Sequence, residues 1–178
     1  GGIAFSQAHA EEMSLETAEA RYEVAPRERV LDGRVEAVQQ ATVSAQTSGR
    51  VAELPFDIND FVDAGSVVMR FTDTEQRAAL QSAEAAQAEA RARLANAEQE
   101  YERASRMIEN NTISQAQYDQ VRANRDSARA RRDAAIAGVE AAKEQLEYTV
   151  VRAPYAGIVS ERHVELGELV SPGQPLIS

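Results

Sequence analysis

The chain has 178 residues, a formal net charge of −10 and no cysteine. Its length favours one or two domains, and its acidity argues against nucleic acid as a partner, because phosphates are bound by an excess of positive charge. The absence of cysteine excludes disulfides and thiolate metal sites.

The N-terminal segment, residues 1–21, has features of a processed secretory signal. Ala8-His9-Ala10 has the small-x-small form of a signal-peptidase site and follows a short, weakly apolar run. We therefore expect residues 1–21 to be a signal-peptide remnant or a flexible terminus. The sequence contains no run of about eighteen apolar residues, the shortest that spans a bilayer as a helix.

Between Tyr22 and Phe71 the apolar residues alternate with polar ones, which is typical of short β-strands. Glycine and proline interrupt this pattern repeatedly and predict turns. We expect one or two strands in residues 22–38 and the first half of a β domain in residues 39–72. Thr72-Asp73-Thr74-Glu75 then predicts a helix start, with Thr72 or Asp73 as N-cap and Glu75 or Gln76 completing a capping box.

Residues 73–148 carry two long helical patterns joined by a short break at 109–114. In each pattern one row of residues recurs at alternating spacings of three and four, which is the seam of a coiled coil. The first seam is Leu80, Ala83, Gln87, Ala90, Leu94, Ala97, Tyr101, Ala104 and Ile108. The second is Tyr118, Val121, Arg125, Ala128, Arg132, Ala135, Val139, Ala142 and Leu146. Because the break is short, we predict an antiparallel helical hairpin with arms of about 50 Å.

Residues 149–178 repeat the strand pattern that precedes the hairpin. With a shift of 108 residues, the matched pairs are Val43/Val151, Ala45/Ala153, Gly49/Gly157, Val51/Val159, Asn59/Gly167, Val62/Val170, Gly65/Gly173 and Val68/Leu176. Glycine or asparagine recurs where a tight turn needs positive φ, and aliphatic residues recur where strands face a core. Neither half is long enough to bury its apolar face alone. We therefore predict an α+β fold, in which the hairpin is inserted between two halves of one small β-sandwich.

The two halves resemble those of a lipoyl or biotinyl carrier domain. The residues that carry this resemblance are Gly49-x-Val51 with Val62-x-x-Gly65, and Ala153-Pro154-Tyr155-Ala156-Gly157-x-Val159 with Gly167-x-x-Val170-x-x-Gly173-Gln174-x-Leu176. Split by a helical hairpin, this pattern is similar to that of bacterial periplasmic adaptors, or membrane fusion proteins, of the hemolysin-secretion-D type. The resemblance implies a β-barrel beyond the lipoyl-like domain. The chain stops at Ser178, so it implies a fragment, with residues 22–38 as an orphan strand of that truncated barrel.

The apex of the hairpin carries a pattern that sharpens the resemblance. Adaptors of resistance–nodulation–division pumps have an Arg-x3-Leu-x6-Ser motif that docks the outer-membrane channel, and here it falls on Arg103, Met107 and Ser114. Methionine replaces leucine, a change that conserves volume and keeps an apolar contact. A purely structural interpretation stands beside this one, because Ser114 with Gln117 also has the spacing of a capping box.

The resemblance implies a periplasmic adaptor, associated with the inner membrane, that bridges an inner-membrane transporter and an outer-membrane channel and self-associates into a ring. We expect no enzymatic activity, cofactor or metal. Adaptors of ABC-type or major-facilitator export systems are the alternatives within the family. A lipoyl or biotinyl carrier domain and a plain coiled-coil scaffold are alternatives from other classes. The carrier needs a lysine at a tight β-turn, whereas the single lysine, Lys143, falls inside the second predicted helix.

Overall fold

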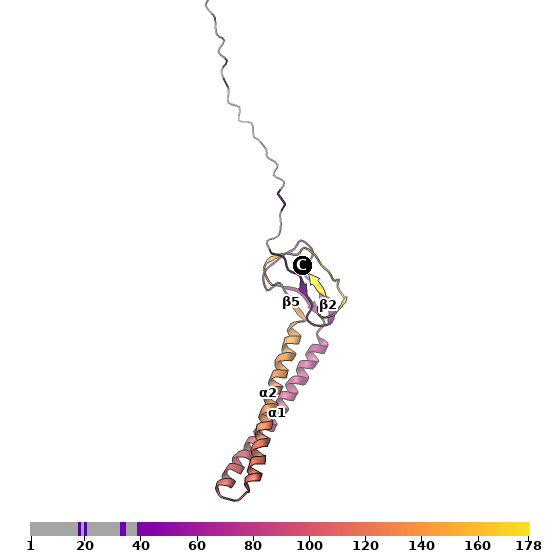
Figure 1. Cartoon of the computed structure of the whole chain (residues 1–178). Coiled ribbons are helices and arrows are strands. Elements are labelled where there is room, and N and C mark those ends of the chain that lie inside the picture. The colour runs from indigo at the N-terminus through magenta and orange to yellow at the C-terminus, as the bar shows by residue number, and fades with distance from the viewer. Residues whose placement is uncertain (1–17, 19, 21–32, 35–38) are drawn as a thin grey trace, which may run out of the picture. The chain divides into compact units, whose positions relative to one another are not determined.

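The computed structural model describes residues 18, 20, 33–34 and 39–178 (Figure 1). The chain divides into two units, residues 1–37 and 38–178, and the second contains the helices and strands described below. The signal remnant or flexible terminus predicted for residues 1–21 and the strands predicted for residues 22–38 fall almost entirely outside the described residues.

Eight short strands form the β unit. They are β1 (Val43–Ser44), β2 (Gly49–Glu53), β3 (Phe61–Val62), β4 (Val67–Phe71), β5 (Val150–Arg152), β6 (Gly157–Ile158), β7 (Leu169–Val170) and β8 (Pro175–Ile177). The first four come before the helices and the last four after them. Four antiparallel pairings, β1–β8, β2–β7, β3–β6 and β4–β5, each join a strand of one half to a strand of the other. The two halves are therefore interleaved into one β unit, which confirms the predicted fold class.

The internal repeat is visible in the backbone as well as in the sequence. Asn59 and Gly167, which the repeat aligns, have φ of 73° and 83°, and Gly65 and Gly173 have φ of 79° and 88°. Glycine adopts this left-handed region without steric cost, and asparagine tolerates it better than most residues. The expectation of positive φ is confirmed at these two aligned pairs. It is wrong for the third, Gly49 and Gly157, which lie within strands β2 and β6 and do not have positive φ.

The core of the β unit is built from equivalent residues of the two halves. Val62 and Val170 are buried at aligned positions, as are Val68 and Leu176. They belong to one cluster, whose buried members are Ala45, Val51, Val62, Val68, Met69, Phe71, Val151, Ala153, Val159, Val164, Val170, Leu176 and Ile177. Each fully buried aliphatic side chain of this size contributes about 1.5–3 kcal/mol relative to its exposed state. Each half therefore supplies the apolar surface that the other needs.

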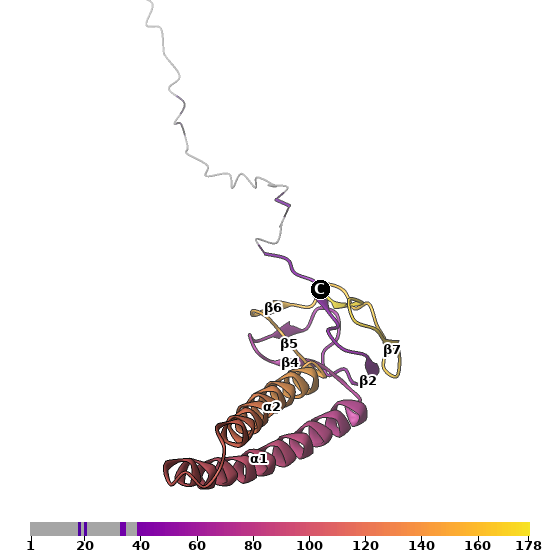
Figure 2. The ribbon, with the colours of Figure 1, turned by 60° about the horizontal axis from the view of Figure 1, so that its bottom comes forward.

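The hairpin consists of α1 (Thr74–Glu109) and α2 (Gln115–Glu147), which run side by side (Figure 2). All eighteen predicted seam residues are buried or half-buried, while nearly every other residue of the two helices is exposed. Ala90, Leu94, Ala104 and Val139 are the buried members of the seam. The predicted antiparallel coiled-coil hairpin is thereby confirmed. Among the described residues, neither helix has a stretch apolar enough to cross a membrane.

The start of α1 differs from the prediction. Asp73 is the N-cap residue, but its side chain makes no capping hydrogen bond. Its carboxylate instead accepts a hydrogen bond from Nε of Arg77 at 2.7 Å, and the side chain of Gln76 is directed to the β unit. The capping box predicted for this helix is therefore wrong, because both of its side chains have other partners.

Candidate functional site

The apex of the hairpin is a short, internally hydrogen-bonded turn, residues 110–114. The backbone N–H of Asn110 donates to the carbonyl of Arg106 at 3.3 Å, and the backbone N–H of Asn111 donates to the carbonyl of Ile108 at 3.1 Å. Thr112 donates to the carbonyl of Met107 twice, from its backbone N–H and from its hydroxyl, at 2.9 Å each. These bonds satisfy carbonyls that the end of a helix leaves without a partner. The turn is therefore closed by its own backbone, and its shape does not depend on a bound partner.

Ser114 begins α2 with a complete capping box. Its Oγ accepts a hydrogen bond from the backbone N–H of Gln117 at 3.1 Å, and Oε1 of Gln117 accepts one from the backbone N–H of Ser114 at 3.0 Å. The capping role predicted for Ser114 is confirmed. A serine hydroxyl has one donor and two acceptor positions, so the cap leaves its proton available to an outside acceptor. Capping and docking are chemically compatible at this residue.

Arg103 and Met107 lie one turn apart near the end of α1, outside the seam. Arg103 is exposed and Met107 is half-buried. Within the described range 39–178, Arg103 forms no ion pair, a property it shares with three other arginines of the hairpin, whereas the remaining six are paired. An arginine whose forked donor group is exposed in this way is suited to a carboxylate or a backbone carbonyl of another molecule.

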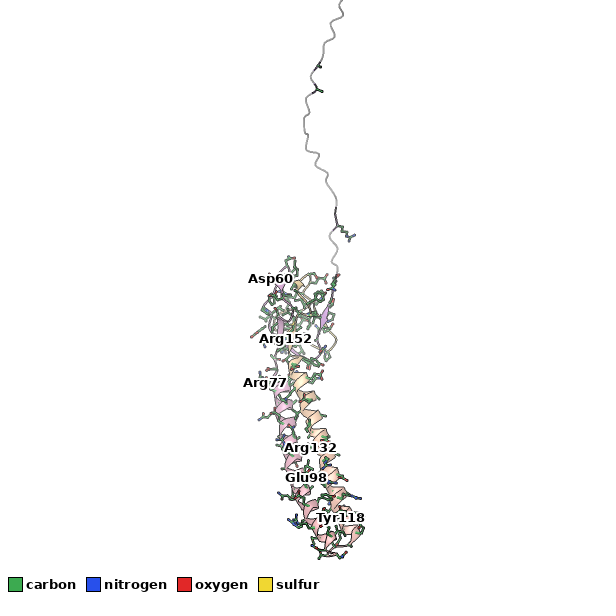
Figure 3. The ribbon with its side chains drawn as sticks, turned by 90° about the vertical axis from the view of Figure 1, so that its left-hand side faces the viewer. Asp60, Arg77, Glu98, Tyr118, Arg132 and Arg152 are labelled. Carbon is green, nitrogen blue, oxygen red and sulfur yellow. The ribbon has the colours of Figure 1, made fainter. Side chains whose placement is uncertain are left out.

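A layer of aromatic and basic side chains supports the apex from inside the hairpin. The hydroxyl oxygens of Tyr101 and Tyr118 lie 3.0 Å apart, and the guanidinium carbon of Arg125 lies 4.0 Å from the centre of the Tyr101 ring. Figure 3 places Tyr118 close to the apex. The sequence analysis placed all three residues in the seams but did not predict that they contact one another. Aromatic residues in both seams close to the break were the signal that could have revealed it.

The cluster shifts the acidities of its own members. The hydrogen bond from Tyr118 lowers the pKa of the Tyr101 hydroxyl below its ordinary value of 10.0, and the same bond raises the pKa of the Tyr118 hydroxyl above it. Burial on its own lowers the pKa of Arg125, but the hydrogen bond and charge of Asp126 outweigh that effect and leave this pKa raised. Arg125 therefore stays charged within the seam.

The side chains of the apex offer several kinds of recognition group. Residues 103–118 contain two guanidiniums, a carboxylate, a thioether and hydroxyls. Of these, Arg103, Met107 and Ser114 provide charge, an apolar contact and a short hydrogen bond, which are the elements of a binding surface.

Comparison with known proteins connects this architecture to one family. Residues 79–149 match the family model described as RND MFP, alpha-helical hairpin domain. The uncharacterized protein YdhJ of Escherichia coli (strain K12) is 33% identical over 147 residues, which are 83% of this chain and 51% of YdhJ. The multidrug resistance protein MdtA of Photorhabdus laumondii is 27% identical over 159 residues, which are 89% of this chain and 40% of MdtA. The chain thus spans about half the length of YdhJ and less of MdtA.

Solved structures share the fold. MacA from Actinobacillus actinomycetemcomitans matches with a TM-score of 0.56 and 22% identity, over 80% of this chain and 49% of MacA. ZneB from Cupriavidus metallidurans matches with a TM-score of 0.56 and 20% identity, over 77% of this chain and 58% of ZneB. The chain belongs to the membrane fusion proteins, the family that the hairpin model describes. The resemblance inferred from the half-motifs and the hairpin is confirmed.

Proposed function

We propose that this chain is the part of a periplasmic adaptor that docks the outer-membrane channel of a tripartite efflux pump through the apex of its hairpin. The observation that carries the proposal is Arg103, an exposed arginine beside a closed, capped turn at the end of two arms of about 50 Å. The match to a hairpin model of the RND type favours a resistance–nodulation–division transporter as the inner-membrane partner over ABC-type or major-facilitator systems.

Each of the three apex residues has a distinct role in this proposal. Arg103 donates from its guanidinium to carboxylates or carbonyls of the channel. Met107 provides a flexible apolar contact, to which its half-buried side chain is suited. Ser114 holds the start of α2 with its acceptor and donates its hydroxyl proton to the channel.

The rest of the chain has a supporting role. The β units of several copies pack side by side around the export path, so that the hairpins stand together as a ring. The end of the β unit that carries Asp60, which lies away from the hairpin (Figure 3), faces the inner-membrane transporter. In this arrangement the protein acts in the periplasm, next to the inner membrane, and catalyses no reaction. If the apex binds the open state of the channel more tightly than the closed state, docking shifts the channel toward the open state.

The carrier alternative is weakened by the position of the single lysine. Lys143 lies within α2, where its Nζ is 3.7 Å from a carboxylate oxygen of Glu140. The hairpin itself occupies the connection between the paired strands β4 and β5. A modified lysine needs a tight β-turn that presents it to an acylating enzyme, and Lys143 has a helical setting instead.

The decisive variant is Arg103→Asp, with Arg91→Asp as its matched control. Both arginines are exposed on α1 and both substitutions change the net charge equally, but Arg91 lies farther from the apex. We expect Arg103→Asp to weaken binding of the full-length adaptor to the outer-membrane channel of its own organism by at least about tenfold, which corresponds to about 1.4 kcal/mol. Arg91→Asp should bind as the wild type does, and the helical circular dichroism of both variants should be unchanged. Equal binding by both variants would contradict docking through Arg103.

A further inference from the structure

The buried polar side chains of the described residues all lie where the hairpin joins the β unit. They are Thr47, Gln76 and Thr149, with exposed fractions of 5%, 8% and 3%. Thr47 belongs to the loop between β1 and β2, Gln76 to the first turn of α1, and Thr149 to the segment between α2 and β5. Burying a polar group costs free energy unless it is hydrogen-bonded. Their concentration at one place indicates a specific joint.

Gln76 and Thr149 are the continuation of the two coiled-coil seams at this end of the hairpin. Gln76 precedes Leu80 by four residues, and Thr149 follows Leu146 by three, so both keep the seam spacing. Along the arms, seam residues of one helix pack against the other helix. At the root the apolar seam is therefore replaced by side chains that form directed hydrogen bonds.

Gln76 connects α1 to the β unit. Its Nε2 donates to Oγ1 of Thr47 at 3.1 Å and to the carbonyl oxygen of Ser48 at 3.0 Å. One side chain thus satisfies two acceptors of the same loop from inside the joint. Apolar contacts are non-directional, whereas hydrogen bonds weaken steeply when their geometry changes. The pair of bonds therefore restrains the direction in which α1 leaves the β unit.

The other connections at the root fix the chain before α1 and after α2, but not the direction of α1. The backbone N–H groups of Phe71 and Thr72 donate to the carbonyls of Thr149 and Arg50, at 2.8 and 2.9 Å. The hydroxyl of Thr149 donates to the carbonyl of Leu146 at 2.6 Å and so closes the end of α2 on itself. None of these bonds involves a side chain of α1, so Gln76 has no substitute among them.

We propose that Gln76 is the positioning residue that sets the direction of the hairpin relative to the β unit. The length of the arms makes this direction consequential, because a tilt of about 10° at the root moves the apex by roughly 9 Å. A fixed direction of the hairpin would hold the apex at one position. The relevance of this to channel docking rests on the function proposed above. The joint itself is a property of the isolated chain and is tested without any channel.

The test is a distance distribution between spin labels in the full chain, which has no cysteine and so accepts labels only at introduced sites. One label replaces Asp63 in the β unit and the other Ala95 in α1, both of which are exposed. We expect Gln76→Met, which keeps the length of the side chain but removes its donors, to broaden or shift this distribution. The matched control is Gln87→Met, the same exchange at a half-buried seam residue farther along α1. It should leave the distribution as in the wild type.

A second label pair, Ala95 with Ala137, lies within the hairpin and should be unaffected by Gln76→Met. Thr47→Val removes one of the two acceptors and should broaden the first distribution to a smaller extent. If Gln76→Met loses its helical circular dichroism, Thr47→Val decides the question. A distribution between Asp63 and Ala95 that stays unchanged in the folded variants would overturn the proposal, whatever the outcome of the docking experiment.

Discussion

The hydroxyl groups of Tyr101 and Tyr118 form a hydrogen bond of 3.0 Å between the two arms of the hairpin. The rings are tilted by 35°, with centroids 5.8 Å apart, and the guanidinium of Arg125 covers the ring of Tyr101. A cation over an aromatic face is attracted to the quadrupole of the ring. This layer therefore ties α1 to α2 just below the apex, by contacts more directional than those of the alanine-rich seam.

The tyrosine pair makes a prediction about titration. Tyr118→Phe removes the hydrogen bond that lowers the pKa of Tyr101, so this pKa should rise toward its ordinary value of 10.0. Phenolate absorbance during an alkaline titration measures the shift, with Tyr101→Phe as the variant that assigns the signal. A Tyr101 that titrates identically with and without the Tyr118 hydroxyl would show that the hydrogen bond is absent in solution.

The pKa shifts of Tyr101 and Tyr118 also determine whether the folded chain gains or loses stability at high pH. The folded-state pKa of Tyr118 is raised, so its contribution to stability is present below pH 10.0 and is lost as the pH rises through the higher folded value. The folded-state pKa of Tyr101 is lowered, so its contribution appears above pH 10.0 and is lost as the pH falls through the lowered value. Loss of the second proton leaves two like charges in contact. The wild type should therefore lose more thermal stability than Tyr118→Phe as the pH rises well above 10.

Ser114 allows capping and docking to be separated by substitution. Ser114→Ala removes the acceptor of the Gln117 N–H and should destabilise the chain by about 1 kcal/mol in urea unfolding. Ser114→Asp keeps a capping acceptor and should be close to the wild type in stability. Because aspartate has no hydroxyl proton, both variants should bind the channel less tightly. Wild-type binding by Ser114→Asp would mean that Ser114 serves only as a cap.

Substitution of glycine by alanine should change the stability in opposite directions at Gly138 and Gly49. A Cβ at Gly138, within α2, meets nothing within 4 Å, so Gly138→Ala should stabilise the chain by about 0.5–1 kcal/mol. A Cβ at Gly49 would lie 3.1 Å from both Cβ of Phe71 and the carbonyl oxygen of Thr72, so Gly49→Ala should destabilise it by about 1–3 kcal/mol. Urea unfolding measures both changes. Equal effects of the two substitutions would contradict the tight packing of β2 against the end of β4.

The fold was largely predictable because its two main features are periodic. The seam spacing identified both helices, and the repeat that aligns Val62 with Val170 identified two halves of one β unit. Ser114 was predictable as a cap because capping depends on residues close in the sequence.

The features that sequence reasoning missed depend on contacts between distant residues. The same local reasoning wrongly predicted a capping box between Asp73 and Gln76. Gln76 instead bonds to Thr47, which is distant in the sequence and lies near Gln76 only in the folded β unit. Likewise, the register of the two arms decides that Arg125 covers Tyr101, and a seam pattern fixes spacing along each helix but not the register between them.

Contact between the apex and the outer-membrane channel is tested most directly by site-specific photo-crosslinking in cells that produce the full-length adaptor. A photoreactive residue in place of Glu109, at the exposed end of α1, should form a covalent adduct with the outer-membrane channel, identified by mass spectrometry. The same residue in place of Glu84, exposed nearer the root, should not. A channel adduct from position 84 but not from position 109, or from neither, would contradict the account.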